Sequence, residues 1–334
     1  MRITRSTLHK IAKDTVAQRV KTDHNVMAAL LVGSALAEDP FIGHTTDIDI
    51  VYVCLNEPET ARQIVKLTNE ISLDLYFVES IAFEPPRKLR TEPLLGYVMY
   101  DSLPLFETQH FFEYTQAIVR AGFDDTANVL ARARKHSIPA RELWMELTLG
   151  GNSRPSDVLT YIKAVSHAAN AVAGLSGPPL TDRRFLLEFE DRARTIDKPE
   201  LHDALLNLLG APSVTPADLM AMLPAWATAY HAAGDGADFI IHPDRIAYNR
   251  SAIETLLQGA RPMSALWLLV RTWAAASASL LEYGPEYVAW KAVFERLGLA
   301  GDGFEGKVQA LDRFLDETEE LLDTIAAENG ISQG

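Results

Sequence analysis

Two short motifs decide how this chain is interpreted: LVGS at residues 31–34 and DIDI at residues 47–50. Twelve residues separate them, and that gap is rich in glycine, proline, threonine and acidic residues, as a loop would be. The first motif ends an apolar run, and the second opens DIDIVYVC, which is dense in β-branched and aromatic residues. The pattern therefore predicts two strands, over residues 28–32 and 47–54, joined by a loop.

Two aspartates lie on the second predicted strand. Asp47 and Asp49 are two residues apart, so their side chains point to one face, while Ile48 and Ile50 point to the other. Two carboxylates about 5 Å apart repel by roughly 3 kcal/mol at an effective dielectric of 20, unless a cation lies between them. Carboxylate oxygens are typical Mg²⁺ ligands. Taken alone, the pair fits a solvated strand edge without function equally well.

The residues around this pair favour a phosphate site over a plain turn. Gly33 at a strand end would let backbone N–H groups approach a phosphate, and Ser34 adds a hydroxyl donor. A further strand is predicted over residues 71–78, and Asp74 is the only acid within it. Asp74 is then either a third site carboxylate or an edge-strand residue that faces water.

Together these residues resemble the signature of the DNA polymerase β-like nucleotidyltransferase superfamily. That signature is a hydrophobic residue, Gly-Gly or Gly-Ser, a short gap, and Asp-x-Asp or Asp-x-Glu between hydrophobic residues. A third carboxylate follows on a later strand, a place that Asp74 matches. The chain looks most like the small-molecule adenylyltransferases that modify aminoglycoside or lincosamide antibiotics. The resemblance covers about residues 25–110.

The resemblance implies a two-metal phosphoryl transfer with Mg²⁺. Asp47 and Asp49 would hold the nucleotide-bound metal and, with Asp74, a second one, and Asp74 would also act as general base. Gly33 and Ser34 would bind the phosphates of an NTP, which is expected to be ATP. AMP would pass to a hydroxyl of a small-molecule acceptor, with release of pyrophosphate. Two alternatives stay open: a non-catalytic, regulatory protein of the toxin–antitoxin kind, and an enzyme that acts on RNA or protein.

The expected fold class is α+β, with two domains. A nucleotidyltransferase domain with a mixed sheet and flanking helices is predicted over residues 1–118, and an all-α helical domain over residues 119–334. Within the first domain, Pro58 and its acidic neighbours predict a helix that runs to about Asn69. Short strands are predicted over residues 97–100 and 103–106. In the second domain alanine and leucine dominate, and glycine and proline separate the predicted helices.

Composition narrows the possible partners. A net charge of −14 disfavours nucleic acid as a partner, because such binding depends on lysine and arginine facing phosphates. The most apolar later run, residues 265–281, is short and contains Arg271, so no membrane span is predicted. The single cysteine, Cys54, excludes an internal disulfide and a multi-cysteine metal site. We expect a cytoplasmic protein, and the sequence does not indicate its oligomeric state.

Overall fold

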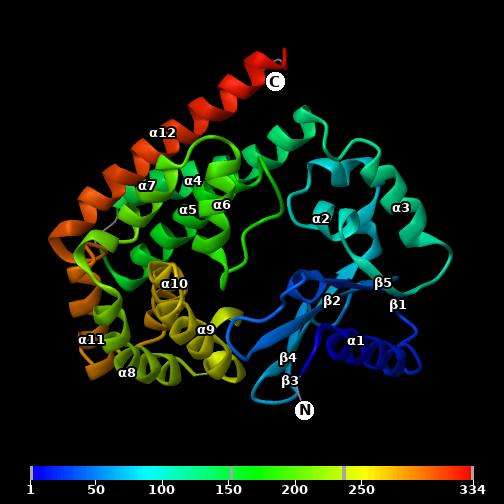
Figure 1. The fold of residues 1–334 in the computed structure, drawn as a ribbon, viewed down its shortest axis with the longest axis horizontal. Coiled ribbons are helices and arrows are strands. Elements are labelled where there is room, and N and C mark those ends of the chain that lie inside the picture. The colour runs from blue at the N-terminus through cyan, green and yellow to red at the C-terminus, as the bar shows by residue number, and fades with distance from the viewer. Residues whose placement is uncertain (1–2, 151–152, 235–237, 332–334) are drawn as a thin grey trace. The chain divides into compact units, whose positions relative to one another are not determined.

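The computed structural model describes residues 3–150, 153–234 and 238–331 (Figure 1). The chain divides into two compact units, Met1–Val129 and Leu130–Gly334. Helix α3 (Phe111–Arg120) spans the predicted domain boundary at residue 118 and packs within the first unit, against the sheet and its neighbouring short helices.

The first unit is built on a five-stranded mixed sheet with strand order β3-β4-β2-β1-β5. Its strands are β1 (Val26–Val32), β2 (Thr46–Cys54), β3 (Arg62–Lys66), β4 (Ile71–Glu79) and β5 (Leu103–Glu107). Strand β4 runs parallel to β2, and the other neighbouring strands pair antiparallel. The predicted mixed sheet is confirmed, and the central strands β1, β2 and β4 are those that the hydrophobic pattern predicted.

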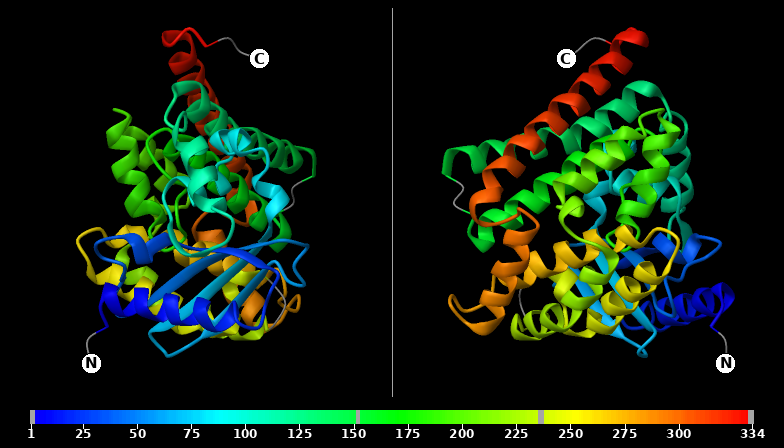
Figure 2. Two further views of the ribbon diagram at one scale, coloured as in Figure 1. Left: turned by 90° about the vertical axis from the view of Figure 1, so that its right-hand side faces the viewer. Right: turned by 60° about the vertical axis from the view of Figure 1, so that its left-hand side comes forward.

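Helix α1 (Arg5–Arg19) covers one face of this sheet (Figure 2). Its buried residues are Leu8, Ala12 and Val16. They pack on Ile48, Ile50 and Tyr52, which alternate with the aspartates along β2, and on Leu73 and Leu75 of β4. Burial of this continuous apolar layer is the main source of stability for the sheet. It also fixes the register, because a shift by one residue would turn every aspartate into the core.

The opposite face packs against a layer of short helices within the first unit. Helices α2 (Leu95–Tyr100) and α3 and the 3₁₀ helices η2 (Ser80–Phe83) and η3 (Pro86–Thr91) belong to this layer. Their apolar side chains pack on the later residues of β2, Val51 and Val53. The aspartates precede these valines on the same face, because side chains alternate along a strand. Strand β2 thus carries an apolar half and an acidic half on one face.

The predicted helix over residues 56–69 is wrong. This segment contains strand β3, which pairs antiparallel with β4 through Ile64 opposite Asp74 and Val65 opposite Leu73. The proline and acids that suggested a helix start lie in an irregular connection before Arg62. Pairing with β3 satisfies the backbone N–H and C=O groups along one edge of β4. This stabilisation comes from a neighbouring strand, so the local helix propensity of residues 56–69 does not indicate it.

The predicted strand over residues 97–100 is also wrong, because these residues belong to helix α2. Gly96 lies against the backbone of η3, where an added Cβ would come within 2.2 Å of the Leu89 carbonyl oxygen. Tyr97 and Tyr100 both pack their rings on Phe123, in edge-on and stacked arrangements. Contacts with residues far along the chain therefore determine this helix. The neighbouring strand prediction is confirmed by β5.

The described part of the second unit contains helices and no strand. Its α-helices, of which the first begins just before the unit boundary, are α4 (Thr126–Gly150), α5 (Pro155–Ala173), α6 (Phe185–Thr195), α7 (Glu200–Leu208), α8 (Pro216–Ala232), α9 (Ile246–Gln258), α10 (Ala265–Ser277), α11 (Pro285–Arg296) and α12 (Phe304–Glu328). Arg141 of α4 pairs with three acids of α12, namely Asp312, Asp316 and Glu319. Among the described residues, every helix is too short or too polar to cross a membrane.

His136 and His167 lie in contact inside this unit, and we expect them to make its stability depend on pH. Nδ1 of His136 lies 3.4 Å from Nδ1 of His167, and burial together with this neighbour lowers the pKa of His136 to about 4. Burial also lowers the pKa of His167. Folding therefore favours the neutral rings. Stability is fully present above the unfolded pKa near 6.5 and falls as the pH drops from there toward 4.

We expect His136 to account for a loss of about 2 to 3 kcal/mol of unfolding free energy over that range. Urea unfolding between pH 7.5 and 4.5 measures it, and a His136→Gln variant should show a shallower pH dependence. An identical slope in the two proteins would contradict the prediction.

Candidate active site

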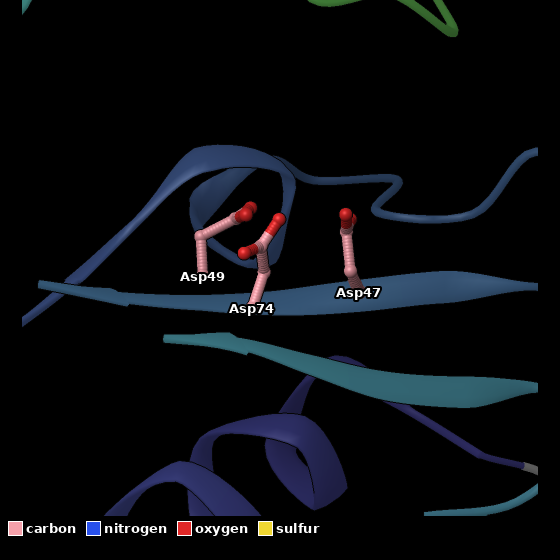
Figure 3. Close-up of side chains that lie close together, drawn as sticks. All are labelled: Asp47, Asp49 and Asp74. Atoms are coloured by element: carbon pink, nitrogen blue, oxygen red, sulfur yellow. The ribbon is translucent and has the colours of Figure 1, made fainter. Parts of the chain in front are cut away.

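Three carboxylates come together on the face of the sheet opposite α1. Asp47, Asp49 and Asp74 each offer an oxygen, and these three oxygens lie within 4.8 Å of one another. All three side chains rise from the same side of the sheet (Figure 3). Asp74 is 1% exposed and Asp47 8% exposed, whereas Asp49 is half-buried. Burial strengthens the repulsion between like charges, so a nearby positive charge would stabilise this cluster.

The parallel pairing of β2 and β4 sets this geometry. Asp49 and Asp74 occupy the same register position on neighbouring strands, and Asp47 stands two residues earlier on β2. All three therefore project from one face. The flanking residues Ile48 and Leu73 point to the opposite face and pack under α1. The alternation of buried apolar and acidic residues thus holds the carboxylates on a rigid support.

Gly33 closes the site on the side of β1. It follows Val32, which pairs with Asp49, and it adopts the left-handed conformation with φ of +71°. A Cβ added at Gly33 would lie 2.3 Å from Oδ2 of Asp49. Only glycine lets the chain turn here with its backbone this close to the carboxylate. The turn continues as the 3₁₀ helix η1 (Gly33–Leu36).

Ser34 lies in the same turn and faces the start of β2. Its Oγ is 3.3 Å from Oγ1 of Thr46, a fully buried residue that donates a hydrogen bond to the Pro40 carbonyl. This contact ties the turn after β1 to the strand that carries the two aspartates. The structure therefore brings Gly33 against Asp49, and Ser34 against Thr46, the residue that precedes Asp47.

Arg62 is a part of this cluster that the sequence analysis missed. Its Nε donates to Oδ1 of Asp74 at 2.8 Å, and its Nη2 donates to Oδ2 at 2.6 Å. The Tyr76 hydroxyl also donates to Oδ2 of Asp74, at 3.2 Å, and the guanidinium lies 4.7 Å from the centre of the Tyr76 ring. RQIVK, residues 62–66, shows no polar–apolar alternation, and the adjacent β-branched residues Ile64 and Val65 were the one local signal for a strand here.

Comparisons with known proteins add little to this picture. No family model and no curated protein matches the chain. One solved structure that it resembles is that of a nucleotidyltransferase-like protein from Exiguobacterium sibiricum. The identity is 12%, the match covers 59% of this chain and 67% of that chain, and the TM-score is 0.33. A TM-score this low does not establish a common fold, so the function proposed below rests on the site.

The donor set suits a hard divalent cation. Carboxylate oxygens are the ligands that Mg²⁺ prefers in proteins, and here three of them converge from two strands. Arg62 contributes one positive charge beside the three carboxylates, through its ion pair with Asp74. A divalent ion would add further positive charge at the cluster. Asp47, Asp49 and Asp74 are therefore the residues that could hold a metal ion.

Proposed function

We propose that this chain is a Mg²⁺-dependent nucleotidyltransferase of the DNA polymerase β-like superfamily. It would transfer AMP from ATP to a hydroxyl of a small-molecule acceptor and release pyrophosphate. The observation that carries the proposal is the convergence of Asp47, Asp49 and Asp74 on neighbouring strands, with the Gly33 turn against Asp49. Gly33 and the three aspartates, which are separated in sequence, thus lie close together.

Each residue has a role in this proposal. Asp47 and Asp49 would hold the metal with the nucleotide, while the Gly33 amide and the Ser34 hydroxyl would donate to the β- and γ-phosphates. Asp74 takes the proton of the acceptor hydroxyl at a carboxylate oxygen, since it lies beside the other two acids. When bound, Mg²⁺ would supply charge neutralisation for the phosphates and activation of the attacking oxygen.

The acceptor is proposed to be small and neutral or cationic, such as an aminated sugar. The net charge of −14 disfavours a long polyphosphate, because RNA binding depends on basic residues. Aminoglycoside-like acceptors combine hydroxyl groups with positive charge and therefore suit an acidic protein.

Labelled ATP tests this function directly. The chain is incubated with ATP labelled at the α-phosphate and Mg²⁺, with total RNA in one reaction and a panel of amino- and hydroxyl-bearing small molecules in another. The proposal predicts pyrophosphate release and label on a small molecule. Label only in RNA would reject the small acceptor and leave the reaction type intact. ATP binding without pyrophosphate release under any condition would indicate the regulatory alternative.

A further inference from the structure

The guanidinium of Arg62 contacts both carboxylate oxygens of Asp74. Both Asp74 oxygens accept from the guanidinium, at 2.8 and 2.6 Å, and a planar two-point contact of this kind is the strongest that an arginine makes with a carboxylate. Asp74 itself is 1% exposed. An ion that binds both oxygens of this carboxylate must therefore displace the guanidinium.

Arg62 is also held in this place from a second direction. It lies over the ring of Tyr76, which stands two residues after Asp74 on the same face of β4 and directly opposite Arg62 in the β3–β4 pairing. The Tyr76 hydroxyl donates to the same carboxylate. The contact is thus built from three residues of one hairpin, and a mobile surface side chain would not be supported in this way.

We propose that Arg62 is the built-in counter-ion of the three-carboxylate cluster. It holds Asp74 in the absence of metal and limits tight divalent-ion binding to one ion, at Asp47 and Asp49. A second ion that binds Asp74 through both oxygens does so only by competing with the guanidinium. The inference rests on the proposed function, since it assigns a metal to the same cluster. Arg62 is accordingly a positioning residue that acts through Asp74.

Removal of the arginine should separate metal binding from turnover. Without the guanidinium the cluster has one positive charge fewer, so divalent ions should bind more tightly. Without the two-point contact, Asp74 loses the partner that orients it, so turnover should fall. A purely structural arginine would change both quantities in the same direction, because a loosened site binds metal less well and turns over more slowly.

The experiment uses Mn²⁺ alone, without nucleotide, and counts free and bound ions by electron paramagnetic resonance. The wild-type chain should bind one Mn²⁺ tightly and a second weakly. Arg62→Met should bind Mn²⁺ on the order of tenfold more tightly, with two ions at moderate concentration. Pyrophosphate release by this variant should be lower than in the wild type. Arg62→Gln serves as a second charge-removing variant, and thermal unfolding followed by circular dichroism checks that each protein is folded.

Two further variants test whether the effect depends on the positive charge at residue 62 and on its position beside Asp74. Arg62→Lys keeps the charge without the planar fork, so its Mn²⁺ affinity should stay within about threefold of the wild type. Lys66→Met removes an exposed positive charge from the same strand and face, and its affinity should change by less than about twofold, since solvent screens it.

Unchanged or weaker Mn²⁺ binding by a folded Arg62→Met protein would overturn the inference. If neither the wild type nor the variant binds Mn²⁺, both the inference and the metal site of the proposed function are rejected. If the variant binds more tightly but no protein releases pyrophosphate with any acceptor, the inference stands and the proposed function fails.

Discussion

Asp49→Asn is expected to lower nucleotidyl transfer by roughly three orders of magnitude or more. The amide has the size of the carboxylate but lacks the charge that holds a divalent ion, and metal-assisted phosphoryl transfer draws several kcal/mol of charge stabilisation from that ion. Asp49 is also the member of the cluster that lies against the Gly33 turn, where the phosphates are proposed to bind. The loss should therefore affect both metal and nucleotide binding.

The fold of the Asp49→Asn protein should persist. Removal of one charge from three crowded carboxylates relieves repulsion, so thermal unfolding should occur at the same or a higher temperature. A matched control is Asp14→Asn, which makes the same chemical change at an exposed acid of α1 and should leave turnover unaltered. Turnover at the wild-type rate in the Asp49→Asn protein would refute the assignment of Asp49.

Gly33→Ala is expected to have the second largest effect, of about a hundredfold or more on turnover and about 2 kcal/mol on stability. Two costs combine at this position. The left-handed backbone, with φ of +71°, strains any residue that has a Cβ, and the new methyl would lie 2.3 Å from Oδ2 of Asp49. Either the turn or the carboxylate must move, and either movement disrupts the proposed site.

Gly330→Ala separates the two costs. Gly330 has a similar φ of +63°, but a Cβ added there meets nothing within 4 Å. This variant should lose about 1 kcal/mol of stability through backbone strain and keep full turnover. Calorimetric unfolding and pyrophosphate release measured on both proteins decide the matter. Equal turnover in the Gly33→Ala and wild-type proteins would show that the close approach has no functional role.

Much of the acidic site can be predicted from local sequence. Alternation places Asp47 and Asp49 on one face of a strand, because Ile48 and Ile50 must face the core. Asp74 stands out as the only acid in a second apolar strand. Their convergence follows once β2 and β4 pair in parallel at equal register, and the hydrophobic pattern on the α1 face excludes a shift by one residue.

The rest depends on contacts that local sequence does not report. Strand β3 has only five residues, and two of them are apolar, so its pairing with β4 decides its conformation. Helix α2 likewise follows from its contacts with η3 and Phe123. The prediction of a helix over residues 56–69 also concealed Arg62, because on a helix nothing would have directed it toward Asp74. The wrong prediction of a helix over residues 56–69 therefore left Arg62 out of the predicted site.

The connectivity of β2, β3 and β4 also implies an order of assembly during folding. Strands β3 and β4 are joined by a short turn over residues 67–70, so their hairpin closes over a small loop, whereas the parallel pairing of β4 with β2 joins residues about 25 apart. The hairpin contains both Arg62 and Asp74. We therefore infer that the ion pair forms before β4 meets β2. When β4 later pairs with β2, the negatively charged Asp74 approaches the negatively charged Asp49. Arg62 already compensates the charge of Asp74 at that point, which lowers the free-energy barrier to this pairing.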